Sequence, residues 1–228
     1  MSVGAERSGS DWMSAIMVAC AVIVTALLAV REGRDYLGDR SSRSPTVRYV
    51  KGWESFAAKN VRMGPANAQV VIVEFGDLQC PWCRRFMSRI DSARARYRDT
   101  LALVFAHFPL EAHLQAMAAA TAAECADKQG KMANFIETAY AEQDSLGREA
   151  WGRLASKAGI ADVPAFERCV EAPSDFPRIR NDIAFGTSIG VHATPTVLVN
   201  GWLLRAAPTT SELDSIVRRL LKGKRPTD

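Results

Sequence analysis

The sequence lacks the features that mark several classes of protein. Its 228 residues carry a net charge of only +4, and the positive residues are dispersed among acidic ones, with no basic stripe and interleaved aromatics. A nucleic-acid-binding role is therefore not indicated, and no nucleic acid is expected as a partner. There is also no internal repeat and no low-complexity tract. At this length the chain accommodates one globular domain with appendages.

Metal ligands at a useful spacing are also lacking. A structural zinc site built on one Cys-x-x-Cys pair needs two further close ligands, commonly a second such pair or a His-x-x-x-His pair. The three histidines, His107, His113 and His192, stand apart from one another. We interpret them as structural or loop residues, and no bound metal is expected.

What the chain does contain is Cys80-Pro81-Trp82-Cys83, which follows a hydrophobic run and precedes a helical pattern. Two thiols three residues apart at the start of a helix share one face and are close enough to bridge. Cys80 is nearer the helix end, where unpaired N–H groups and the helix dipole favour a thiolate. We predict a redox pair with Cys80 as the exposed nucleophile, Cys83 as its buried resolving partner, and no cofactor besides this disulfide.

A β-α-β unit surrounds this pair. The β-branched run at 70–75 predicts a strand buried on both faces, and residues 101–108 predict a second, parallel strand. Pro81 suits the first position of the helix between them. We interpret Asp77 as a turn or helix-entry residue.

The rest of the domain reads as a helical block followed by a hairpin and a helix. Several helical patterns and no convincing strand occupy about 111–189. The pair Asn200-Gly201 between two short β runs predicts a hairpin. A last helix is expected over 211–222, with Thr210 as its N-cap. The predicted order is therefore β-α-β, a helical block, then β-β-α.

These segments together resemble the DsbA-like thioredoxin-fold family of disulfide oxidoreductases. The matching segments, in order, are 72–83, 107–110, 118–125 and 194–201. The resemblance covers the domain from about 47 to 222. It implies an α/β thioredoxin-like fold with an inserted helical subdomain.

The resemblance also implies roles for residues near the cysteines. It implies that Glu74, in an otherwise apolar strand, moves protons to and from Cys83; a strand-end glutamate facing water fits the sequence equally well. It implies that Thr194-Pro195 is a cis-proline loop, in which Pro195 shapes the substrate groove and Thr194 tunes the nearby sulfur. An ordinary trans bond is the default alternative. Trp82 is interpreted as an apolar contact for substrates.

Four of the five cysteines follow residue 46, and this even number suits an oxidising compartment, with three pairings formally possible. Some relatives in the resembled family carry a second bridge in the inserted helices, which implies a structural disulfide between Cys125 and Cys169. Two buried free thiols are the alternative. A bridge there would stabilise the fold by roughly 3–4 kcal/mol on the chain-entropy model.

Residues 13–30, which include Cys20, contain no charged side chain and predict a single transmembrane anchor. A helix of this length reaches roughly 27 Å, about the thickness of the bilayer's hydrocarbon layer. A cleaved signal peptide is the alternative, although its apolar core is normally shorter. Residues 1–12 are then a short tail, 31–46 a juxtamembrane linker and 223–228 a C-terminal tail.

The orientation of this anchor is contested within the sequence. Arginines are more numerous just after it than before it, which by the positive-inside rule would leave the domain in the cytoplasm. The even number of cysteines argues for the opposite side. We expect a single-pass protein of the cell membrane with a periplasmic catalytic domain.

The predicted function is that of an enzyme, a protein thiol-disulfide oxidoreductase that exchanges disulfides with cysteines of exported proteins. Oxidation is the favoured direction; a tethered reductase or isomerase would run the same chemistry in reverse. A non-catalytic metal carrier or a peptide-binding chaperone is the alternative from a different class. The expected partners are cysteine-containing exported proteins, the lipid bilayer through 13–30, and a membrane redox partner that reoxidises or reduces the pair, implied only by the resemblance.

Overall fold

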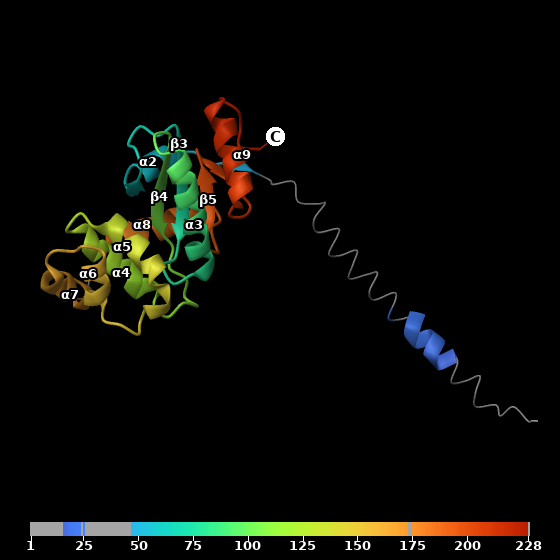
Figure 1. Ribbon diagram of the computed structural model, residues 1–228, viewed down its shortest axis with the longest axis horizontal. Coiled ribbons are helices and arrows are strands. Elements are labelled where there is room, and N and C mark those ends of the chain that lie inside the picture. The colour runs from blue at the N-terminus through green and yellow to red at the C-terminus, as the bar shows by residue number, and fades with distance from the viewer. Residues whose placement is uncertain (1–15, 24, 26–46, 173–174, 228) are drawn as a thin grey trace, which may run out of the picture. The chain divides into compact units, whose positions relative to one another are not determined.

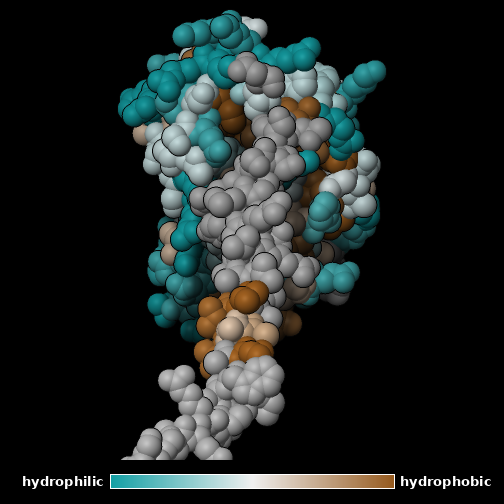
Figure 2. Space-filling model, turned by 90° about the vertical axis from the view of Figure 1, so that its right-hand side faces the viewer, coloured by the Kyte–Doolittle hydropathy of each residue, from teal (hydrophilic) through white to brown (hydrophobic). Residues whose placement is uncertain are grey.

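The computed structural model describes residues 16–23, 25, 47–172 and 175–227. Residues 16–23 and 25 are helical, and the large apolar side chains among them are exposed (brown in Figure 2). No helix in these described ranges has the length and apolar character needed to cross a bilayer. The rest of the predicted anchor 13–30, the tail 1–12 and the linker 31–46 lie outside them.

The larger compact unit, Val47–Asp228, is built around one mixed sheet. In the described part of this unit the sheet has six strands in the order β1-β6-β5-β3-β4-β2, of which only β3 and β4 pair in parallel. The strands are β1 Arg48–Tyr49, β2 Val61–Met63, β3 Val70–Gly76, β4 Leu101–His107, β5 Thr196–Val199 and β6 Trp202–Leu203.

Helices cover both faces of this sheet and extend beyond one end of it (Figure 1). They are α2 Trp53–Ala57, α3 Pro81–Arg96, α4 Ala116–Asp127, α5 Met132–Ala141, α6 Trp151–Lys157, α7 Val163–Glu171, α8 Pro177–Ser188 and α9 Thr210–Leu221, with a 3-10 turn η1 at Gln143–Ser145.

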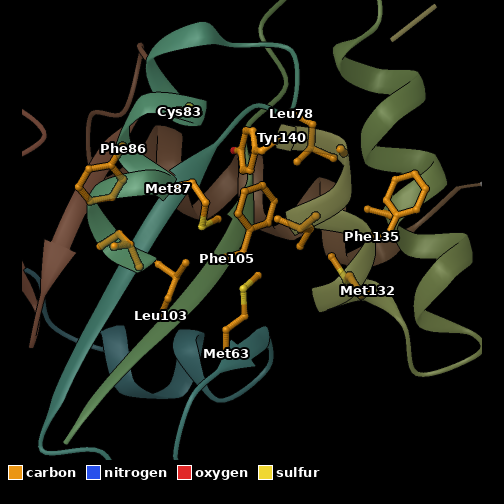
Figure 3. Close-up of a cluster of buried hydrophobic side chains, with 14 of the residues drawn as sticks. Met63, Leu78, Cys83, Phe86, Met87, Leu103, Phe105, Met132, Phe135 and Tyr140 are labelled. Carbon is orange, nitrogen blue, oxygen red and sulfur yellow. The ribbon is translucent and has the colours of Figure 1, made fainter. Parts of the chain in front are cut away.

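Strand alternation in β3 separates two hydrophobic cores. Val70 and Ile72 belong to a core that includes side chains of α3, α5 and α9. Val71, Val73 and Phe75 belong to a second core with α2 and α8. Figure 3 shows the first core, in which side chains of α3 meet those of β4 and α5. Even-numbered positions of β3 therefore face the helix that carries the two cysteines.

The predicted β-α-β unit and hairpin are confirmed. The hairpin turns through Asn200 and Gly201 with φ values of 46° and 81°, which suit this residue pair. The predicted N-cap of the last helix is wrong by one position. Thr209 is the cap, because only Thr209 stands three residues before Glu212 and forms a capping box with it. In the predicted tail after α9, the Arg225 guanidinium lies 5.3 Å from the centroid of the Trp202 ring.

Three short elements, β1, α2 and β2, were not predicted, because none is longer than five residues and such lengths carry little periodic signal. They extend the sheet at both edges and cover part of one face. The site-bearing β-α-β unit lies between these edge strands.

The predicted helical block is confirmed as α4–α8, which follow β4 without an intervening strand among the described residues. Buried polar groups join this block to the sheet. Asp182 accepts a hydrogen bond from the backbone N–H of His107, whose ring lies 3.1 Å from Glu124. The Arg178 guanidinium forms ion pairs with the carboxylates of Glu124 and Asp127. The network holds α8 and α4 against β4.

Within the block, Cys125 of α4 and Cys169 of α7 form a disulfide with an S–S distance of 2.05 Å. The two residues are separated by 44 positions in the chain. The bond therefore links two helices of the insertion that the sequence leaves far apart.

Replacing both Cys125 and Cys169 by alanine is expected to lower the free energy of unfolding by about 3–4 kcal/mol, because the bridge restricts the unfolded chain. Urea denaturation without reductant measures this loss. The matched control is Cys20→Ala, which removes a cysteine outside the block and leaves the midpoint unchanged. An unchanged midpoint for the double variant would contradict the expectation.

Candidate active site

Cys80 occupies the N-cap of α3, with extended backbone angles of φ −74° and ψ 120°. Its carbonyl accepts hydrogen bonds from the N–H groups of Cys83 and Arg84 at 3.1 and 3.2 Å. Pro81 takes the first helical position, where its missing N–H costs nothing. The local sequence thus begins the helix at the first cysteine and places the N–H groups of the first turn near that sulfur.

A loop far away in the sequence covers Cys80. Its Sγ lies 3.4 Å from the carbonyl oxygen of Thr194, which precedes Pro195 through a cis peptide bond. The expectation that Cys80 is exposed is wrong, since only 3% of the residue is accessible. The residues Thr194 and Pro195, which the sequence linked to the cysteines only by resemblance, therefore lie beside the first of them.

The surroundings of Cys80 favour its thiolate and lower the pKa of this thiol from 9.0 to about 5. The largest contribution is a hydrogen bond from the Cys83 thiol; the Thr194 side chain and the N–H groups of Cys83 and Trp82 add to it. Burial opposes them but is outweighed. Cys80 is thus ionised at neutral pH and suited both to attack a disulfide and to leave one.

Cys83 is held in the opposite state. It is fully buried in the first turn of α3, and its Sγ accepts the Asp77 N–H at 3.5 Å. Burial, more than any other cause, raises the pKa of the Cys83 thiol, and the neighbouring Cys80 and Glu74 raise it further. The helix start therefore separates two chemically identical thiols into a thiolate and a protonated partner.

Glu74 lies at an even-numbered position of β3, on the face toward α3, and is fully buried. The alternative in which it faces water is therefore wrong. Burial raises its pKa from 4.5 to about 8, although the Cys83 thiol acts in the opposite direction. Neither carboxyl oxygen has a hydrogen-bond partner of regular geometry. At neutral pH this is a protonated acid close to the Cys83 sulfur.

Trp82, between the two cysteines, is 61% exposed, and the Arg85 guanidinium lies 5.3 Å from its ring centroid. An indole at this position offers an apolar surface beside the reacting sulfur.

Among the described residues, no three His, Cys, Asp or Glu side chains are grouped so as to hold a metal ion.

Sequence reasoning missed Gln143, which follows α5 in the helical insertion. Its side-chain amide is buried and donates to the carbonyls of Leu78 and Cys80 at 2.8 and 3.0 Å. A second contact runs in the other direction: the side-chain oxygen of Gln79, in the cysteine loop, accepts a hydrogen bond from the backbone N–H of Gln115 at 2.6 Å. Two amides thus join the cysteine loop to the insertion. No local pattern marks them, because each partner lies 36 or more positions away.

Asp77 contributes another connection. Its carboxylate accepts the N–H groups of Gln79 and Leu110 at 2.8 and 2.9 Å and lies 2.7 Å from His113 Nδ1. The predicted turn role of Asp77 is correct, but the residue also fixes the loop after β4. His113 consequently lies near the cysteines.

Comparison with known proteins finds a matching family, related sequences and similar solved structures. The sequence matches the family described as thioredoxin over residues 57–219. It is 36% identical over 165 residues to Na(+)/H(+) antiporter NhaA 1 of Mycolicibacterium vanbaalenii, covering 71% of this chain and 26% of the antiporter. The chain thus spans about a quarter of the length of the curated relatives it matches.

Two solved structures share the fold. One is a thioredoxin-like oxidoreductase from Silicibacter pomeroyi, 26% identical with a TM-score of 0.62, covering 74% of this chain and 97% of the other. The other is DsbA2 of Pseudomonas aeruginosa, 27% identical with a TM-score of 0.58, covering 71% and 93%.

If Gln143 fixes the backbone at the helix start, Gln143→Met will raise the pKa of Cys80 from about 5 toward its ordinary value and lower stability by about 1–2 kcal/mol. Methionine fills similar space but donates no hydrogen bond. The pH dependence of Cys80 alkylation by iodoacetamide measures the first effect, and urea denaturation the second.

The matched control is Gln129→Met. The side-chain amide of Gln129 makes two hydrogen bonds with the Asp162 backbone, one as donor and one as acceptor, on an exposed part of the insertion. This change should leave the Cys80 alkylation profile as it is. Equal alkylation profiles in Gln143→Met and the unaltered protein would show that the Gln143 hydrogen bonds do not affect the pKa of Cys80.

Proposed function

The chain belongs to the thioredoxin family, and we propose that it is a thiol-disulfide oxidoreductase that oxidises cysteines of exported proteins through Cys80 and Cys83. The observation that carries this proposal is the opposed state of the two thiols. The pKa of Cys80 is lowered to about 5, whereas that of Cys83 is raised. Only Cys80 is thus a thiolate at neutral pH, able to attack a disulfide and to leave a mixed disulfide.

The same asymmetry supports the oxidising direction. A stabilised Cys80 thiolate favours the reduced enzyme, so the bridged enzyme readily gives its disulfide away. The Cys83 thiol, the N-cap position and the N–H groups of α3 all stabilise that thiolate. The reducing direction would require the opposite preference.

The proposed cycle starts from the Cys80–Cys83 disulfide. A substrate thiolate attacks Cys80 Sγ; the S–S bond breaks, and its electron pair leaves on Cys83 Sγ. A second substrate thiolate then attacks the substrate sulfur of the mixed disulfide and releases Cys80 as a thiolate. The substrate leaves oxidised and the enzyme reduced, so a membrane redox partner is required to restore the bridge.

Glu74 is proposed as the proton donor to Cys83. Because its pKa is raised to about 8, Glu74 carries a proton at neutral pH and lies close enough to Cys83 for the thiol to affect that pKa. As Cys83 is released as a thiolate, Glu74 gives it this proton and becomes a carboxylate. The raised pKa of Cys83 favours the transfer.

The proposal extends to the substrate surface and to the cellular location. Thr194 and Pro195 form the wall against which a substrate segment lies, and the exposed Trp82 ring gives it an apolar contact. We also propose that residues 13–30 anchor the enzyme with its domain outside the cytoplasm. The apolar composition of that stretch and the Cys125–Cys169 disulfide, which suits an oxidising space, support this.

Full-length protein with Cys80→Ser is expected to lose oxidative refolding activity toward a reduced, denatured client, because the Cys80–Cys83 disulfide that a substrate thiolate attacks can no longer form. The reduction potential of the unaltered pair should be well above the thioredoxin value of about −270 mV. The control Cys20→Ser removes a thiol from the predicted anchor and should retain activity. Undiminished refolding by Cys80→Ser, or a potential near that of thioredoxin, would contradict the proposal.

Glu74→Gln is expected to become progressively more stable than the unaltered protein as the pH rises from about 4.5 to about 8. Between these values the folded protein keeps a proton on Glu74 that the unfolded chain releases, so the unaltered protein loses stability with rising pH. The difference between the two proteins should change by roughly 3 kcal/mol between pH 4 and pH 7.

Urea denaturation of the reduced proteins at several pH values measures this difference. The exposed Glu171 supplies the control Glu171→Gln, for which no such trend is expected. A difference between Glu74→Gln and the unaltered protein that does not vary with pH would contradict the buried-acid assignment.

A further inference from the structure

Tyr140, on the inserted helix α5, places a buried hydroxyl near the sulfur that the reaction releases. The residue is only 2% exposed, and its hydroxyl has no hydrogen-bond partner of regular geometry. It is nevertheless close enough to Cys83 and Glu74 for both to contribute to raising its pKa. Figure 3 shows the ring extending from α5 between Phe105 and Cys83, with its hydroxyl on the Cys83 side.

The backbone beside Cys83 leaves room for this hydroxyl. A Cβ atom at Gly76 would lie 3.0 Å from the Tyr140 hydroxyl oxygen and 2.5 Å from the Phe105 ring. The next residue, Asp77, donates its N–H to Cys83 Sγ at 3.5 Å. The glycine therefore lets the tyrosine hydroxyl approach the same region that the Asp77 N–H already serves.

The polar groups around Cys83 are incompletely satisfied in this reduced state. Both carboxyl oxygens of Glu74 and the hydroxyl of Tyr140 are buried without partners of regular geometry. Burying polar groups without such partners costs stability, and a buried group left unsatisfied in a folded protein is often explained by a catalytic role. In the proposed cycle these groups gain a strong interaction when negative charge develops on Cys83.

We propose that Tyr140 is a catalytic residue that donates a hydrogen bond to Cys83 Sγ as the Cys80–Cys83 bridge opens. This inference rests on the proposed function. The substrate thiolate forms a bond to Cys80 Sγ, the S–S bond breaks, and its electron pair moves to Cys83 Sγ. The Tyr140 O–H stabilises this charge, and Glu74 then supplies the proton that converts it to a thiol.

The two groups have different tasks. Glu74, with a pKa of about 8, exchanges its proton near neutral pH. The pKa of Tyr140 lies well above 10, chiefly because of burial, so its hydroxyl keeps its proton and remains a donor. A hydrogen bond to a developing anion is about twice as strong as one between neutral groups. Its effect therefore falls on the transition state for bridge opening.

Tyr140→Phe in the full-length oxidised protein tests this, because it removes the hydroxyl and retains the ring. Reduction of the Cys80–Cys83 disulfide by dithiothreitol, followed in a stopped-flow instrument, should slow by about tenfold. In the same variant, iodoacetamide should alkylate reduced Cys80 at an unchanged rate. The midpoint of urea denaturation should stay the same or rise, because an unpaired buried hydroxyl has been removed.

Tyr97→Phe is the matched control. Tyr97 follows α3, and its hydroxyl donates to Asp214 Oδ1 at 2.6 Å in a partly buried position near α9. Dithiothreitol should reduce the Cys80–Cys83 disulfide of the Tyr97→Phe variant at the same rate as that of the unaltered protein. The Tyr97 variant therefore separates loss of any tyrosine hydroxyl from loss of the one near Cys83.

Reduction of Tyr140→Phe at the unaltered rate would overturn the inference. A slower rate accompanied by slower Cys80 alkylation and lower stability would also overturn it, because that pattern indicates a packing role. If the unaltered protein itself failed to exchange disulfides, the proposed function would fall together with the inference. Normal exchange in the unaltered protein and in Tyr140→Phe would remove only the tyrosine's role.

Discussion

The N-terminus of α3 imposes two electrostatic conditions on two identical side chains, and the chemistry of the site depends on both. Cys80, at the cap, receives hydrogen bonds from its partner thiol and from backbone N–H groups, so its pKa falls to about 5. Cys83, one turn inside, is excluded from water, so its pKa rises. In a disulfide between such sulfurs, Cys83 is fully buried, so an attacking thiolate can reach only Cys80. The low pKa of Cys80 then makes it a good leaving group when the mixed disulfide is resolved.

The helical insertion is part of this site rather than an appendage to it. Gln143 holds the carbonyl of the first cysteine, and Gln115 and His113 bond the residues just before it. The Tyr140 side chain lies in the same buried cluster as the second cysteine. The Cys125–Cys169 disulfide and the Arg178 network stabilise the insertion and its contact with the sheet. These contacts are buried or partly buried, and through them the insertion positions the cysteine loop.

Predictions made from the sequence were most reliable where a signal is local. The buried strand before Cys80, the helix after it and the Asn200-Gly201 hairpin follow from period, proline position and turn chemistry, and each is observed. The three short elements β1, α2 and β2 were missed, because five residues or fewer carry little periodicity. The exposure expected for Cys80 was wrong, because a loop more than a hundred positions away covers its sulfur.

The sequence by itself determined that the two cysteines lie at a helix start, because spacing, a proline and the flanking hydrophobic run act over a few residues. It also determined the order of the main elements. Only the tertiary structure decided that Glu74 faces the cysteines rather than water, that Thr194 covers one sulfur, and that Gln143 and Tyr140 reach the other elements of the site. These contacts join residues distant in the chain, and they arise from how helices pack on a sheet, which no local pattern encodes.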